Sequence, residues 1–210
     1  MITAMEKILV SACLLGEKCT YLGGDNKQDY LEELNRYYDI VPFCPEVEGG
    51  LPTPRKPSEQ RNHGVYHDDG TDVTKAFRLG AYKATQICSY LGIRLAIMKE
   101  RSPSCGPHFI HDGYFKGRVI EGQGETARAL MAMGVQVLNE EEGFALLQSL
   151  RKEREIKDEK TRFAKAKEET PKKEEKPRRE PRPHSFKGKK PAWSYQGKTR
   201  PHAKSKLKRD

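Results

Sequence analysis

Short runs of aliphatic and β-branched residues alternate with longer amphipathic segments over the first two thirds of the chain. The short runs predict strands at about residues 7–13, 39–43, 94–98 and 135–138. Apolar positions three and four apart predict helices at about residues 29–38, 72–91 and 125–133, and a further helix from Glu141. Such alternation is typical of βαβ units in a mostly parallel sheet. The expected fold class is therefore α/β, as a single domain in which helices flank a small sheet.

Two segments depart from this alternation. Residues 44–70 are rich in Gly and Pro, which predicts a long loop, and loops of this length in a compact domain are commonly functional. Residues 109–119 contain Asp112-Gly113, a pair typical of the turn between two short extended pieces. We expect a functional loop after the second strand and a hairpin after the third.

Charge divides the chain at about residue 150. Residues 1–150 hold 16 Lys/Arg and 20 Asp/Glu, whereas residues 151–210 hold 23 and 10, and the whole chain has a net charge of +9. The first part is long enough for a core, but the second has too few aliphatic residues to offset chain entropy. We expect an α/β domain over residues 1–150, a charged helical extension over 151–170 and a disordered basic tail over 171–210.

All five cysteines lie in the first part of the chain, and an odd number of them without an export signal argues against a disulfide framework. Met1–Val10 has no apolar run of the length that an export signal needs. No other stretch approaches a membrane span. We therefore expect a cytoplasmic protein with reduced thiols and no membrane partner.

Three of these cysteines each follow a predicted strand: Cys13 follows the first, Cys44 the second and Cys105 the third. Ligands of open α/β sheets bind outside the carboxyl ends of the strands, so we expect these three thiols to converge on one site. Two prolines and a glycine within residues 102–107 hold the Cys105 thiol against a fixed backbone. Cys88 differs, because it falls on the apolar stripe of a predicted helix and is expected in the core.

Three thiolates can hold zinc with an open fourth position, or an iron–sulfur cluster in which one iron lacks a protein ligand. Either arrangement leaves a Lewis-acidic metal facing a substrate. Soft thiolates suit both metals, so the spacing of the cysteines alone does not choose between them. Cys19, which lacks the close spacing to Cys13 of a zinc knuckle, is a candidate substitute ligand or redox partner.

Polar residues next to these cysteines are further candidates. Glu46 lies two positions after Cys44 and can act as a general acid or base, or it is an ion-paired loop residue. Ser102 can donate a hydrogen bond to a bound ligand or cap the turn, and Ser104 is a candidate substrate contact in the same loop. Arg55 is a candidate to orient an anionic or carbonyl-bearing substrate, although a surface position fits it equally well.

Five ordered blocks of the sequence resemble those of the thiouracil desulfurase family, over about residues 6–140. The blocks are residues 10–16, 44–46, 49–55, 69–74 and 99–106. The resemblance implies a 4Fe-4S cluster held by Cys13, Cys44 and Cys105, with catalytic roles for Glu46 and Ser102.

The implied reaction is the removal of sulfur from a thiolated pyrimidine as free base, nucleoside or RNA residue. The open iron would bind the thiocarbonyl sulfur, and water would replace it with oxygen without net redox change. One departure is visible, because the family commonly has Arg-Tyr-Asp-Gly where this chain has Thr20-Tyr-Leu-Gly23. A substrate contact assigned to that loop therefore does not transfer directly.

The basic tail lies outside the resemblance. Residues 181–210 hold ten Lys/Arg and one acidic residue, interleaved with Phe186, Trp193 and Tyr195. Cations with aromatic rings that can stack suit RNA, so we hypothesise that the tail brings the domain to thiolated RNA. Two alternatives stay open: a basic RNA-binding or ribosome-associated protein whose cysteines hold a structural metal, and a zinc hydrolase that uses the same thiols.

Overall fold

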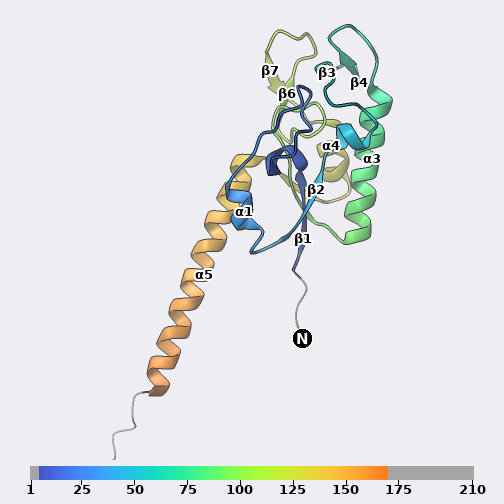
Figure 1. The fold of residues 1–210 in the computed structure, drawn as a ribbon. Coiled ribbons are helices and arrows are strands. Elements are labelled where there is room, and N and C mark those ends of the chain that lie inside the picture. Colours follow the sequence, from blue (N-terminus) through green and yellow to red (C-terminus); the bar gives the residue numbers. More distant parts are fainter. Residues whose placement is uncertain (1–4, 170–210) are drawn as a thin grey trace, which may run out of the picture. The chain divides into compact units, whose positions relative to one another are not determined.

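The computed structural model describes residues 5–169, with the side chains of residues 5–165. The elements, in chain order, are β1 (Lys7–Ser11), the 3-10 turn η1 (Ala12–Leu15), α1 (Tyr30–Leu34), β2 (Asp39–Phe43), α2 (Pro45–Glu48), β3 (Ser58–Arg61), β4 (Gly64–His67), α3 (Thr74–Leu91), β5 (Leu95–Ile97), β6 (Phe109–His111), β7 (Val119–Glu121), α4 (Glu125–Ala132), β8 (Gln136–Leu138) and α5 (Glu140–Glu169) (Figure 1). The predicted tail at 171–210 lies outside these residues.

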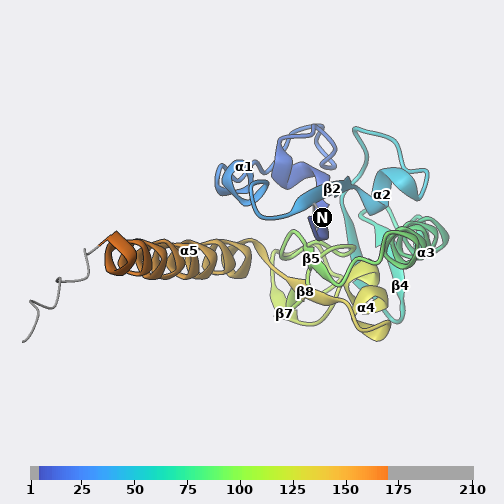
Figure 2. The same ribbon diagram turned by 90° about the horizontal axis from the view of Figure 1, so that it is seen from below.

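A four-stranded parallel sheet of order β2-β1-β5-β8 forms the centre of the domain. Figure 2 shows α1 and α5 on one side of this sheet and α3 and α4 on the other. Ile8, Leu9 and Val10 of β1 are fully buried, as expected for a strand with both faces covered. The predicted α/β fold with a mostly parallel sheet flanked by helices is confirmed.

Alternation along β1 divides the core into two layers. Ile8 and Val10 pack with Leu31 of α1 and Leu147 of α5, whereas Leu9 packs with residues of α3 and α4. Successive strand side chains point to opposite faces, which accounts for this division. Each fully buried aliphatic side chain stabilises the fold by about 1.5–3 kcal/mol, so β1 anchors both layers.

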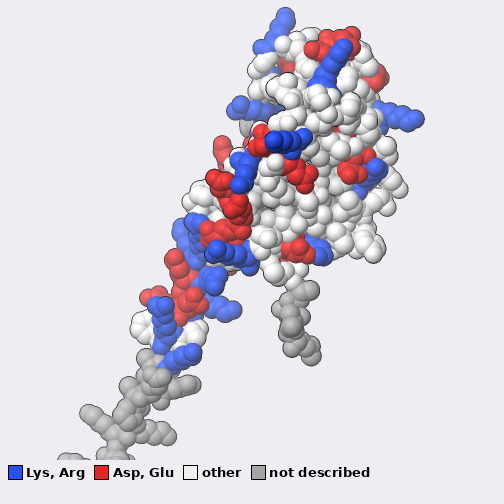
Figure 3. All heavy atoms as spheres, viewed as in Figure 1, with Lys and Arg blue, Asp and Glu red and all other residues white. Residues whose placement is uncertain are grey.

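The first turns of α5 belong to the domain, and its later turns do not contribute to the core. Leu147 is fully buried, whereas residues 151–165 are all exposed. Lys and Arg side chains alternate with Asp and Glu along this part of the helix (Figure 3). Between residues 5 and 169, no helix combines the length and the apolar character that crossing a bilayer demands.

Three predicted elements were wrong in extent. The first strand ends at Ser11 rather than at residue 13, because the chain turns into η1 there. The first helix covers only Tyr30–Leu34. Residues 44–70 are not one loop, since they contain α2 and the β3-β4 hairpin. β3 is polar and β4 has only four residues, so neither strand carries an apolar period that a sequence pattern could detect.

Two hairpins lie beyond the carboxyl ends of the parallel strands (Figure 1). β3 pairs with β4 through a turn at Asn62 and His63, which both have positive φ, as hairpin turns of type I′ require. The predicted hairpin at 109–119 is confirmed as β6 and β7. Glu59 joins the two hairpins, because its Oε2 accepts hydrogen bonds from the backbone N–H groups of Gly113 and Phe115, each at 2.9 Å.

Candidate active site

The three cysteines that follow strands meet at one cavity of about 750 Å³. Cys13 lies in η1 directly after β1, Cys44 directly after β2, and Cys105 in the loop after β5. β1 is flanked by β2 and β5, so the strand order reverses direction beside it, and such a switch point is where open α/β sheets bind ligands. The predicted convergence of the three strand ends is therefore present in the structure.

The loop that carries Cys105 is held by the beginning of α4. The backbone N–H of Glu125 donates to the carbonyl of Pro103 at 3.0 Å, and the N–H of Thr126 donates to the carbonyl of Ser104 at 2.8 Å. These carbonyls satisfy N–H groups that the first turn of a helix leaves unpaired. Gly124 permits the approach, because a Cβ there would lie 2.4 Å from Ser104 backbone atoms. Cys105 is fixed in this way by groups far along the chain.

Cys19 also faces the cavity and contacts two of the three thiols. Sγ of Cys44 lies 3.8 Å from the carbonyl oxygen of Cys19. Interaction with the Cys19 thiol lowers the pKa of Cys13 and lowers the pKa of Cys44 to about 7, and the pKa of Cys19 itself is raised. Burial raises the pKa of Cys105 well above its usual range, with a further contribution from the negative charge of Cys13. Cys13 and Cys44 are thus predisposed to be thiolates, the form that binds metals.

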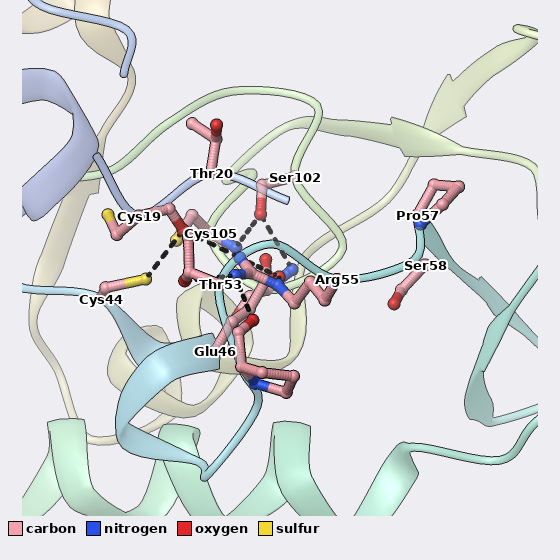
Figure 4. Close-up of polar contacts among 12 residues, drawn as sticks. Cys19, Thr20, Cys44, Glu46, Thr53, Arg55, Pro57, Ser58, Ser102 and Cys105 are labelled. Carbon is pink, nitrogen blue, oxygen red and sulfur yellow. Dashed lines mark hydrogen bonds and ion pairs between the residues drawn. The ribbon is translucent and has the colours of Figure 1, made fainter. Parts of the chain in front are cut away.

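Glu46 and Arg55 form a buried ion pair at the wall of the cavity (Figure 4). The side chains are 14% and 3% exposed, and Nε and one terminal nitrogen of Arg55 each lie 2.7 Å from Oε2 of Glu46. The other Arg55 donors reach the carbonyls of Pro52 and Cys19 and the hydroxyl of Thr53. The guanidinium therefore makes four hydrogen bonds within the protein and an ion pair with Glu46, so Arg55 holds the Glu46 carboxylate in place.

The two predicted serines have different surroundings. Oγ of Ser102 faces the cavity and accepts hydrogen bonds from the N–H groups of Ser104 and Cys105, each at 3.1 Å. Its own O–H hydrogen can therefore point into the cavity. Ser104 is fully buried, and its hydroxyl lies 3.1 Å from the hydroxyl of Thr126. The structure places Ser102 in the site, but it does not bring Ser104 to the cavity.

Cys88 is 1% exposed on α3, and burial raises its pKa to about 11. It packs in the core with Leu9 and Ala84, and it is not among the residues that line the cavity. The expectation that Cys88 is a core residue is confirmed. Its thiol is thus chemically separate from the other four cysteines.

Sequence reasoning missed several polar residues in the cavity wall. Lys99, Glu100 and His111 all line it. Lys99 is paired with Glu140 at 2.7 Å, and Glu100 accepts hydrogen bonds from loop N–H groups. Nδ1 of His111 is buried and has no hydrogen-bond partner among the described residues. Lys99 and Glu100 directly follow β5, and this position at a strand end was a sequence signal for a place in the site. His111 reaches the site only through the β6-β7 hairpin.

The segment that departs from the family pattern forms a tight turn at the cavity mouth. The Thr20 hydroxyl donates to the carbonyl of Gly24 at 2.9 Å and accepts from the Gly24 N–H at 3.0 Å. Tyr21 and Leu22 are exposed and line the cavity. The Arg55 N–H donates to the carbonyl of Tyr21 at 2.8 Å, which ties this turn to the loop that holds Glu46.

The ligand arrangement differs from that of a mononuclear metal site. Within residues 5–165, no three His, Cys, Asp or Glu side chains are placed so as to bind a single metal ion. A four-iron cluster is larger, and each cysteine binds a different iron, so its thiolates need not meet at one point. Three thiols spread along the wall of one cavity fit such a cluster.

The chain is similar to known proteins in sequence and in fold. The family model described as 2-thiouracil desulfurase matches residues 8–142. The uncharacterized protein YbbK of Bacillus subtilis (strain 168) is 36% identical over 145 residues, which cover 64% of this chain and 96% of YbbK. The solved structure of the [4Fe-4S]-dependent thiouracil desulfidase TudS has a TM-score of 0.64 and 44% sequence identity, and the match covers 69% of this chain and 99% of that chain.

Proposed function

Because the chain belongs to the 2-thiouracil desulfurase family, we propose that it is an iron–sulfur-dependent enzyme that cleaves the C–S bond of a thiolated pyrimidine such as thiouracil. One observation carries this proposal: Cys13, Cys44 and Cys105 face a single cavity together with Glu46 and Ser102. The cavity volume of about 750 Å³ is within the range of small-ligand sites.

Cys13, Cys44 and Cys105 are the proposed ligands of a 4Fe-4S cluster, and the lowered pKa values of Cys13 and Cys44 favour this role. When bound, a cluster with three protein ligands supplies an open, Lewis-acidic iron that suits a soft thiocarbonyl sulfur. Cys19 contacts two of these ligands but lies outside the proposed set.

Glu46 is the proposed general acid and base. The hydrogen bond and the ion-pair contact from Arg55 both go to Oε2, so Oε1 can accept or deliver a proton at the cavity surface. Two positions need such a group: a ring nitrogen of the pyrimidine, and the water that supplies the new oxygen. A positioned carboxylate typically contributes about 10²–10⁴-fold to such proton transfers. Arg55 is the proposed positioning residue, because it fixes the carboxylate and its own hydrogen bonds are made within the protein.

Ser102 is the proposed hydrogen-bond donor. Because its oxygen already accepts from the N–H groups of Ser104 and Cys105, its hydroxyl hydrogen is directed away from the loop backbone. It can donate to the exocyclic atom of the pyrimidine, first sulfur and then oxygen. The same N–H groups fix the serine rotamer, so little conformational entropy is lost when a ligand binds.

The proposed overall reaction is a hydrolysis. One water molecule replaces the sulfur on the ring carbon, the C–S bond breaks, a C–O bond forms, and sulfur leaves as hydrogen sulfide. No electron is gained or lost by the pyrimidine, so the reaction needs no reductant. Glu46 takes a proton from the attacking water and can return it to the departing sulfur or to the ring.

The form of the substrate is a finer proposal that rests on composition. Residues 181–210 lie outside the described part of the chain, and their ten Lys/Arg with three aromatic residues support binding to RNA. We propose that this segment brings thiolated RNA to the domain. A chain that lacks residues 181–210 should then bind RNA more weakly at low salt but convert free thiouracil at an unchanged rate. Equal RNA affinity of both chains would contradict the idea.

The test measures the iron, sulfide and zinc content of anaerobically purified protein, its visible spectrum and its turnover of 2-thiouracil. About four irons and four sulfides per chain, a broad sulfur-to-iron band and equal yields of uracil and sulfide are expected. A triple Cys13, Cys44 and Cys105 to Ala variant should lack the band and the turnover. A colourless chain that binds zinc would instead favour the zinc hydrolase or the structural-metal alternative.

A further inference from the structure

Cys19 is a fourth cysteine at the cavity and has no part in the proposed chemistry. It is buried, lines the cavity and packs in the same cluster as Cys13, with Cys44 against it. The Cys44 thiol lies against the Cys19 backbone, with its Sγ 3.8 Å from the Cys19 carbonyl oxygen. A buried cysteine ordinarily fills space in a core, but this one lies against two thiols and an open cavity. Its surroundings are those of a thiol that can exchange bonds.

The position of Cys19 is set by the protein backbone, independently of any bound cluster. The Cys19 N–H donates to the carbonyl of Glu17 at 2.8 Å. The Cys19 carbonyl accepts from the buried guanidinium of Arg55 at 3.0 Å, and Sγ of Cys44 lies 3.8 Å from the same carbonyl oxygen (Figure 4). The chain therefore keeps Cys19 beside Cys44 in the cluster-free protein.

Exposure distinguishes the thiols from one another. Cys13, Cys19 and Cys105 are buried, whereas Cys44 is only partly buried. Cys44 is therefore the thiol that a dissolved oxidant reaches first. Cys19 then lies next to the reacted sulfur, while Cys88 is in the core and outside the cavity wall.

We propose that Cys19 and Cys44 form a reversible disulfide in the cluster-free chain, which makes Cys19 a redox modification site beside the active site. The sulfur of Cys44 attacks a low-molecular-weight disulfide and releases one thiol molecule. The sulfur of Cys19 then attacks Cys44 and releases the second. The two cysteines lose two protons and two electrons in total, and the oxidant is reduced to two thiol molecules. A dithiol reverses both steps.

This disulfide would compete with cluster binding, a consequence that rests on the proposed function. Cys44 cannot bind iron while its sulfur is bonded to Cys19. A chain that has lost its cluster would be held in a state that excludes metal but avoids irreversible oxidation of the Cys44 thiol. Reduction would return the free thiol for reloading.

The test uses the full-length chain, stripped of metal with a chelator, reduced and then exposed to glutathione disulfide. Non-reducing peptide mass mapping should find a Cys19–Cys44 bond in the wild type and in the matched control Cys88→Ser. Cys19→Ser should instead accumulate a mixed disulfide of Cys44 with glutathione, because the second step is blocked. Uptake of iron and sulfide by the oxidised wild type should be at least about tenfold slower than by the reduced chain, and dithiothreitol should restore it.

The proposal would be overturned if the oxidised wild type had no Cys19–Cys44 bond. It would also be overturned if Cys13 formed a disulfide with Cys44 at the same rate in the wild type and in Cys19→Ser. Mapping of the wild type needs no variant, so a misfolded variant does not weaken the test. A chain that forms the disulfide but never takes up iron would contradict the proposed function and leave the disulfide standing.

Discussion

Replacement of Arg55 by Met tests whether the buried ion pair fixes Glu46. Arg55 is 3% exposed, Glu46 is 14% exposed, and two Arg55 nitrogens lie 2.7 Å from one carboxylate oxygen. Removal of one partner of a buried pair typically costs about 3–5 kcal/mol, because the other charge is left uncompensated. Glu46 keeps some contact with solvent in the cavity, so we expect Arg55→Met to lower the free energy of unfolding by about 3 kcal/mol.

The assay is urea unfolding of the reduced, cluster-free chain, followed by circular dichroism. A double variant, Arg55→Met with Glu46→Gln, removes both charges and should be more stable than the Arg55→Met single variant. The coupling energy between the two sites should be at least about 1.5 kcal/mol. The control is Lys83→Met, which breaks the exposed pair of Lys83 with Glu48, whose side chains are 45% and 48% exposed, and should cost less than about 1 kcal/mol. Equal losses of unfolding free energy in Arg55→Met and Lys83→Met would refute the assignment of Arg55 as the group that holds Glu46. Additive losses in the double variant would refute it as well.

Three further predictions follow from the site. Ser102→Ala should bind iron normally but lower kcat for 2-thiouracil by about 10²-fold, and an unchanged kcat would show that the hydroxyl takes no part. The pKa of Cys44 is lowered to about 7 and the thiolate is the reactive form, so iodoacetamide labelling of Cys44 in the cluster-free chain should rise with pH and level off above pH 8. Cys88, with its pKa raised to about 11, should stay unlabelled. Peptide mass mapping of both cysteines checks this. Gly80→Ala should destabilise the fold by at least about 2 kcal/mol in urea unfolding, because its Cβ would lie 1.9 Å from the carbonyl oxygen of Pro45, at the start of the helix that carries Glu46. The same substitution at an exposed helical position should cost nothing.

Much of the architecture was accessible from the sequence because it depends on local patterns. The strand at 39–43 begins and ends where the aliphatic run predicts, and the helix before Gly92 has the expected apolar stripe. Cys13, Cys44 and Cys105 could be brought together without coordinates, because parallel strands place their carboxyl ends at one edge. The hairpin within residues 58–67 was missed, since its four-residue strands are stabilised by pairing with each other and by contacts to distant loops.

The side-chain partners within the site could not be read from the sequence. Nothing in the spacing of Arg55 and Glu46 says whether the guanidinium faces a substrate or a carboxylate. Ser102 and Ser104 occupy the same loop, yet only Ser102 reaches the cavity, while Ser104 turns toward Thr126 on α4. The proximity of Cys19 to two thiols depends on how a surface turn folds back.

The sequence by itself determined the α/β class, the parallel sheet and the edge at which the thiols gather, because these follow from hydrophobic periodicity and from the direction of successive strands. The tertiary structure decided which polar groups satisfy one another. Arg55 is engaged by Glu46, the Cys105 loop is held by the first turn of α4, and Cys19 is held beside Cys44. Such pairings join segments that are distant in sequence, and each depends on the requirement that buried polar groups find partners once the core has packed.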